Sequence, residues 1–209
     1  MNELFLYDRD KGLFKAILKQ SSVIKGSYHV SKNGGNDLNA NNLETYVKDP
    51  KNGLIDDKKY PMCICPTPSS RMVKINDTKW ELFTFNLFFL TTSNMINNQL
   101  KSPDKDTNTS KSHPWYDWSD MKQCGVDFLD MLMQVTHTKS SGNQRLGALI
   151  KVEFDNSVVK RLTNFSNDQL SGASLSFTVL MFTDTCILKD YTTNALNNII
   201  IPDLEIPTA

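Results

Sequence analysis

The chain has 209 residues, and its 23 Lys and Arg balance 23 Asp and Glu, so the formal net charge is zero. This length is enough for one substantial hydrophobic core. A net charge of zero argues against a protein whose main role is to bind the phosphates of nucleic acids, because such proteins usually carry an excess of basic residues. No apolar run reaches the roughly 20 residues of a membrane helix, and the first ten residues do not read as a secretory signal. Four scattered cysteines (Cys63, Cys65, Cys124, Cys186) make no disulfide scaffold, so we expect production in a reducing cytoplasm.

Residues 1–59 predict a short helix followed by a long polar connection. The helix is indicated by apolar residues spaced for one helical face: Leu13, Phe14, Ile17 and Leu18. Residues 32–59 are rich in Gly, Asn and Asp, with a turn signal at Gly34-Gly35-Asn36-Asp37.

Two strands are expected next. Residues 60–65 form a compact apolar segment stopped by Pro66, and Pro61 near its start favours an edge position. Residues 79–90 carry apolar side chains on both faces, so we expect both faces to be partly covered. One face holds Phe83, Phe85, Leu87 and Phe89, and the other holds Trp80, Leu82, Phe88 and Leu90.

A helix of about 18 residues is predicted after a polar loop at 91–114. Ser119 can cap the helix start, where Asp120 suits the positive end of the helix dipole. One apolar stripe would pack on the sheet: Met121, Cys124, Phe128, Leu129, Leu132 and Val135.

Two further strands complete the expected fold. Residues 148–154 alternate between apolar and charged side chains, and a run from Gly172 to Ile187 alternates Ala173, Leu175, Phe177, Val179 and Met181 with small polar residues. Before it, Asn167, Asp168 and Gly172 are interpreted as turn-forming residues. We therefore predict an α+β fold, with a mainly antiparallel sheet of about four strands, one long and one shorter helix, and long polar loops.

Residues able to carry chemistry are few. Cys63 and Cys65 point the same way on a strand, but zinc sites usually leave two to four residues between paired cysteines. His29, His113 and His137 lie in unrelated contexts, and none is set beside a cysteine as a recognisable nucleophile and base. We therefore predict no metal site, no cofactor and no catalytic residue.

Two other patterns are better explained by ordinary structure than by a functional site. Gly34-Gly35 lacks the Lys-Ser/Thr and the preceding strand of a phosphate loop. Asp127 and Asp130 lie together on the polar face of the predicted helix, which indicates a solvated surface rather than an acid–base pair.

Aromatic residues just before the long helix are the candidate protein-contact site. Trp115, Tyr116 and Trp118 adjoin a long polar loop, and Trp and Tyr are enriched in interface hot spots. The alternative is a hydrophobic staple that holds the start of the helix.

The order of these segments resembles a known family. The Tyr60-Pro61 strand, the aromatic strand at 80–90, the amphipathic helix, the Arg161–Asn164 turn and the Asn167–Gly172 step occur in sequence. This resembles tail-completion or neck proteins of tailed bacteriophages, of the tail-terminator type, over residues 60–190. Residues 1–59 then form an N-terminal extension, and 191–209 form a C-terminal tail.

The resemblance implies a structural virion protein with no catalysis. Such proteins form rings, commonly hexameric, that cap the tail tube and join it to the head–tail connector. DNA passes through the lumen without sequence-specific binding, and no membrane is involved. We expect neighbouring subunits to be contacted by the loops at 32–59 and 91–114 and by the C-terminal tail. A closed ring requires a heterologous interface, in which two different surfaces of the subunit meet.

Two other functions remain open from the residues alone. One is a soluble ligand-binding or enzymatic α+β domain with a pocket between sheet and helix. The other is a nucleic-acid-binding accessory protein that uses Lys101, Lys105 and Lys111, although Asp104 and Asp106 interrupt that run.

Overall fold

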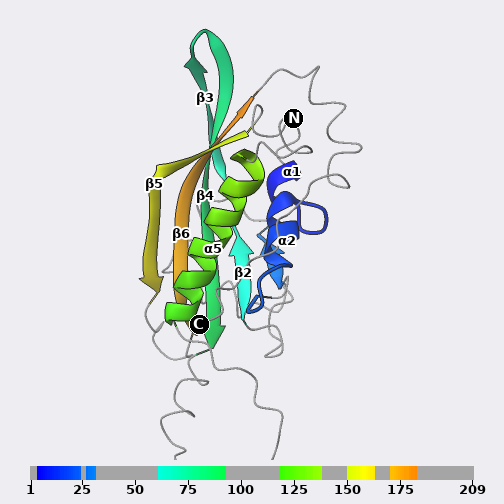
Figure 1. Cartoon of the computed structure of the whole chain (residues 1–209), viewed down its shortest axis with the longest axis vertical. Helices are drawn as coiled ribbons and strands as arrows, with labels where there is room; N and C mark the ends of the chain where they lie inside the picture. Colours follow the sequence, from blue (N-terminus) through cyan, green and yellow to red (C-terminus); the bar gives the residue numbers. More distant parts are fainter. Residues whose placement is uncertain are drawn as a thin grey trace, which may run out of the picture.

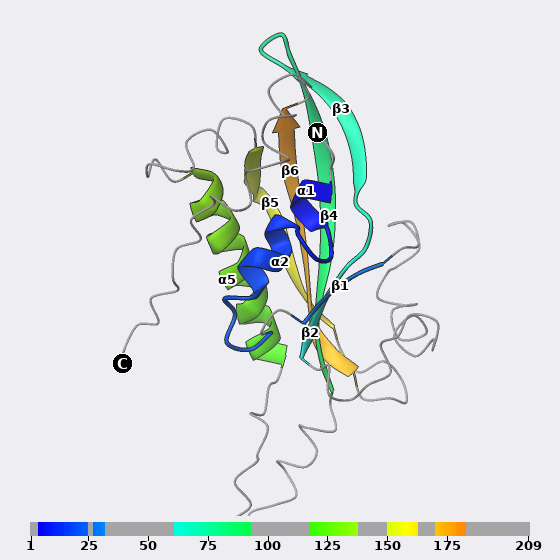
Figure 2. The same ribbon diagram turned by 90° about the vertical axis from the view of Figure 1, so that its right-hand side faces the viewer.

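The structure is a computed structural model that describes residues 4–24, 27–31, 61–92, 118–137, 150–162 and 170–182. The described residues form one open six-stranded sheet in the order β1-β2-β4-β6-β5, with β3 paired to β4. Helices lie on one face of this sheet, which we call the front face, and the other is the reverse face (Figures 1 and 2).

All described strand pairs are antiparallel except the parallel pair β1–β2. The strands are β1 (Tyr28–Val30), β2 (Met62–Cys65), β3 (Ser69–Ile75), β4 (Thr78–Thr92), β5 (Ile150–Leu162) and β6 (Leu170–Phe182). The helices are α1 (Leu4–Tyr7), α2 (Leu13–Leu18) and α5 (Trp118–His137). The predicted α+β class is confirmed, but the sheet has six strands rather than about four.

The two strands that were not predicted lack a sequence signal. β1 has only three residues, and nearly every side chain of β3 is exposed, so neither shows the alternation of a half-buried strand. Pro66 and Pro68 separate β2 from β3, yet both strands pair with the same side of β4. The expected edge position of residues 60–65 is wrong, because β1 pairs on the outer side of β2.

A tight turn joins β3 to β4. Ile75 pairs with Thr78, which leaves Asn76 and Asp77 as a two-residue loop with φ of 47° and 62°. Positive φ at both loop residues is the type I′ arrangement, whose twist matches that of paired strands. The hairpin extends beyond the rest of the sheet (Figure 1).

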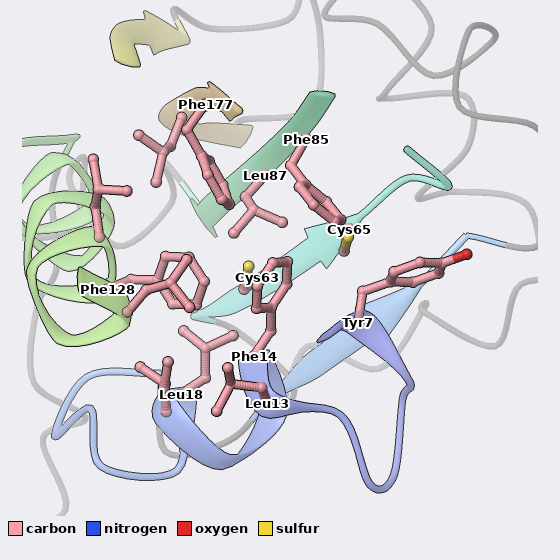
Figure 3. Packing of buried hydrophobic residues seen from close by; sticks show 14 of the residues in the cluster. Tyr7, Leu13, Phe14, Leu18, Cys63, Cys65, Phe85, Leu87, Phe128 and Phe177 are labelled. Carbon is pink, nitrogen blue, oxygen red and sulfur yellow. The ribbon is translucent and has the colours of Figure 1, made fainter. Parts of the chain in front are cut away.

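The core lies between the front face and the helices. The predicted stripe of α5 is buried in it, as are the predicted front-face residues of β4 and β6. Phe14 of α2 enters the same cluster, where its ring lies 4.9 Å from Phe85 and 5.1 Å from Phe128 (centroid distances; Figure 3). Residues of the N-terminal part and of the 60–190 part therefore share one core.

The last two strands differ in detail from the expectation. β5 continues to Leu162, so Arg161 is a strand residue and not part of a turn. The register of β5 against β6 shifts between Glu153 and Val158. Gly172 is inside β6 opposite Leu90, not in a turn. A Cβ there would lie 2.0 Å from the carbonyl oxygen of Phe89, so glycine is required by close strand approach. Asn167 and Asp168 lie outside the described residues.

Candidate protein interface

The cysteines of the described chain are core residues. Cys63 and Cys65 are fully buried on the front face, and Cys124 is buried on α5. Burial raises the pKa of the Cys65 and Cys124 thiols to about 12 and that of Cys63 well above its usual value. A thiol with a raised pKa is a poor nucleophile and a poor metal ligand, because both roles require the thiolate.

The carboxylates of α5 lie on its outer surface. Asp127 accepts a hydrogen bond of 2.7 Å from Nε2 of Gln123, and Asp130 is exposed. In the part of the chain that the structure describes, no three His, Cys, Asp or Glu side chains gather in a way that could bind a metal ion.

Of the predicted contact residues, the structure describes Trp118. It is the first residue of α5 and is half-buried, with the guanidinium carbon of Arg161 4.7 Å from the ring centroid. This contact ties the start of α5 to the end of β5. Trp115 and Tyr116 lie outside the described residues, as do Gly34, Gly35, His113 and the lysines at 101, 105 and 111.

The exposed apolar surface is concentrated at the sides of the sheet. Four large apolar side chains of the described residues are exposed: Met72 (59%) and Ile75 (38%) on β3, and Phe154 (49%) and Val158 (46%) on β5. Among the described strands, β3 and β5 are the outermost neighbours of the long central pair β4–β6. We call these two outer sides the β3 edge and the β5 edge.

The β3 edge carries positive charge beside its apolar residues. Arg71 and Lys74 flank Met72 and are exposed. The Nζ of Lys74 lies 2.6 Å from Oδ1 of Asp77 at the hairpin tip, but both side chains are largely in solvent, so this ion pair holds the hairpin only weakly.

The β5 edge carries acidic groups at its register shift. The Oε2 of Glu153 accepts hydrogen bonds from Oγ1 of Thr178 (2.8 Å) and Nδ2 of Asn156 (3.4 Å). Asp155, next to Phe154, is exposed. The irregular segment thus presents an apolar ring and an exposed carboxylate at adjacent positions.

Sequence reasoning missed both edges. The alternation at residues 148–154 places Phe154 on the same face as the buried Ile150 and Val152, but Phe154 is exposed because the strand register shifts after Glu153. Met72, Ile75 and Val158 lie among polar and charged neighbours, which single positions do not distinguish from ordinary exposed residues. Their shared location emerges only from the strand order.

Comparison with protein-family models and with curated proteins finds no match to this chain. None of the helices in the described ranges has the length and apolar character needed to cross a membrane.

Proposed function

We propose that this protein is a structural virion component of the tail-terminator type, a ring subunit that caps the tail tube and links it to the head–tail connector. The support is the resemblance in segment order together with the α+β architecture. Strands, an amphipathic helix and further strands follow one another from residue 62 to 182 and build one antiparallel sheet covered by α5.

The observation that carries the proposal is the distribution of exposed apolar side chains. In the described part they do not surround a buried polar cluster, as they would at a substrate site. They lie on β3 and β5, which border the long central pair β4–β6 on its two sides, and β3 is part of a projecting hairpin. A subunit that contacts neighbours on both sides needs two such surfaces, whereas an isolated domain does not.

The charge balance agrees with a ring through which DNA passes. Equal numbers of acidic and basic residues give no overall field that would hold DNA tightly. In this proposal the chain needs no cofactor, its partners are further copies of itself, the tail tube and the connector, and it is assembled in the host cytoplasm before it joins the virion.

The proposal is tested by the mass and shape of the purified chain. Native mass spectrometry should give one closed oligomer, for which the resemblance implies a hexamer, and negative-stain microscopy should show rings with an open centre. Antibodies against the chain should label particles at the junction of head and tail. A strictly monomeric mass together with absence from purified virions would show that the proposal is wrong.

A further inference from the structure

We propose that neighbouring copies join edge to edge, with the β3 edge of one copy pairing antiparallel to the β5 edge of the next. This inference rests on the proposed ring and names the surfaces that would form it. A second copy is the proposed occupant of each edge.

The hairpin turn determines which amides of β3 are available. In a two-residue hairpin the closing residues exchange backbone hydrogen bonds, so Ile75 bonds to Thr78, and Val73 bonds to Trp80 two positions on. The backbone groups of Met72 and Lys74 then point away from β4. Cys63 confirms this alternation further along the same side of β4, because its N–H turns outward to the carbonyl oxygen of Ser27 (2.8 Å).

The same alternation extends across the sheet to β5. Registers without shifts connect β3 to β4 and β4 to β6, and β6 continues in register with residues 150–153. Because backbone hydrogen bonding alternates along each strand, Lys151 and Glu153 form backbone hydrogen bonds with β6, and the backbone N–H and C=O of Val152 point away from it. Each edge therefore presents backbone donors and acceptors beside exposed apolar side chains, which is the requirement for strand addition.

Charge favours contact between unlike edges. Pairing β3 with β3 would place Arg71 and Lys74 against the same cations, whereas the part of the β5 edge around Phe154 offers Glu153 and exposed Asp155. The cations of β5 lie elsewhere: Lys160 and Arg161 follow the register shift, and the Lys151 amine lies over the Trp80 ring. Opposite charges across a strand pair are favourable and like charges are unfavourable. The apolar side chains of the two edges, Met72 and Phe154 among them, can then cover one another.

Strand direction fits a closed ring. Because β3 and β6 both run antiparallel to β4, and β5 runs antiparallel to β6, β3 and β5 have opposite directions in one subunit. Rotation about an axis along the strands keeps these directions, so a neighbour's β3 meets β5 antiparallel. An interface between unlike surfaces generates rings when the rotation closes.

The first experiment removes one outward amide. Met72→Pro deletes a donor that faces away from β4, so the hairpin bonds of Val73 and Ile75 stay and the edge position tolerates proline. Met72→Thr is the matched control, because it removes the apolar side chain but keeps the N–H. By sedimentation, Met72→Pro should weaken assembly at least about tenfold and more than Met72→Thr, with unchanged circular dichroism. Equal effects of the two variants would overturn strand pairing at β3.

The second experiment identifies the partner edge. Photoreactive benzoylphenylalanine is placed at position 154 in unlabelled chains, which are mixed with ¹⁵N-labelled chains, and the crosslinked peptides are identified by mass. Crosslinks between differently labelled copies should reach residues 69–75. Rings that crosslink instead to residues 150–162 or elsewhere would overturn this interface but leave the ring function intact. A chain that forms no oligomer would overturn both.

Discussion

At the scale of single residues, Gly172 is the described glycine with the least room for a side chain. Any side chain at this position would meet the backbone of Phe89 and Leu90, which cannot move without separating β4 from β6. We expect Gly172→Ala to lower the free energy of unfolding by about 2–4 kcal/mol, measured by urea denaturation.

Gly125 supplies the matched control for this substitution. A Cβ there would lie 3.5 Å from the Phe89 ring, an ordinary contact, and the residue is inside α5. Gly125→Ala should therefore be neutral or stabilise by up to about 1 kcal/mol, because alanine is the better helix former. If both variants were equally stable, close approach would not explain the glycine in β6.

The buried thiols predict sensitivity to alkaline pH. Burial raises the pKa of Cys65 and Cys124 from 9.0 to about 12, so the folded state binds protons that the unfolded state releases. Their contribution to stability is complete below about pH 9 and is lost as the pH rises toward about 12. The free energy of unfolding, measured across this range, should fall with pH, and less steeply in Cys65→Ala. A slope unchanged by that substitution would exclude Cys65 as a cause.

At the scale of elements, the β3–β4 turn offers a test with a built-in control. Asp77→Gly relieves the positive φ, whereas Asp77→Ala is less suited to it, and both lose the same exposed contact with Lys74. We expect amide exchange at Val73 and Ile75 to slow in the glycine variant and to quicken in the alanine variant. The free energy of hairpin opening obtained from these rates should change by about 0.5–1 kcal/mol in each case. Equal exchange in the two variants would contradict a type I′ turn.

Elements with a buried face were predictable, and those without one were not. β4, α5 and β6 each set apolar side chains on a shared face at the period of their own secondary structure, so their packing could be read in advance. β3 is held by the turn and the backbone ladder of β4 instead, with solvent around most of its side chains. Hydrogen bonding of this kind leaves no apolar period in the sequence.

At the scale of the whole molecule, the candidate interface depends on topology. Met72 and Phe154 are far apart in the chain on strands that never pair, and their relation as opposite edges exists only in the strand order β3-β4-β6-β5. Trp118 could be identified as a candidate from its residue type. Its contact with Arg161 could not be predicted, because the sequence placed Arg161 in a turn whereas β5 continues through that residue. Local patterns thus predicted which residues are buried better than which surfaces are open.

The N-terminal helices should be needed for the whole fold. Phe14 is fully buried, and its ring also lies 5.9 Å from Phe177, so α2 contributes to the core beside α5 on the front face of the sheet (Figure 3). Phe14→Ala should lower the free energy of unfolding by about 3–5 kcal/mol. The exposed Phe154→Ala should change it by less than about 0.5 kcal/mol, provided that both are measured on monomer at low protein concentration.

Deletion of residues 1–31 removes a whole segment of the core rather than one side chain. It removes α1, α2 and β1, which leaves Phe85 and Cys63 uncovered and the outer amides of β2 unpaired. We expect the shortened chain to show no cooperative thermal transition by circular dichroism, because stability of a single core is shared among all elements that cover it. A shortened chain that still unfolds cooperatively, near the temperature of the full chain, would show that residues 62–182 fold as an independent domain and that the N-terminal helices are an addition to it.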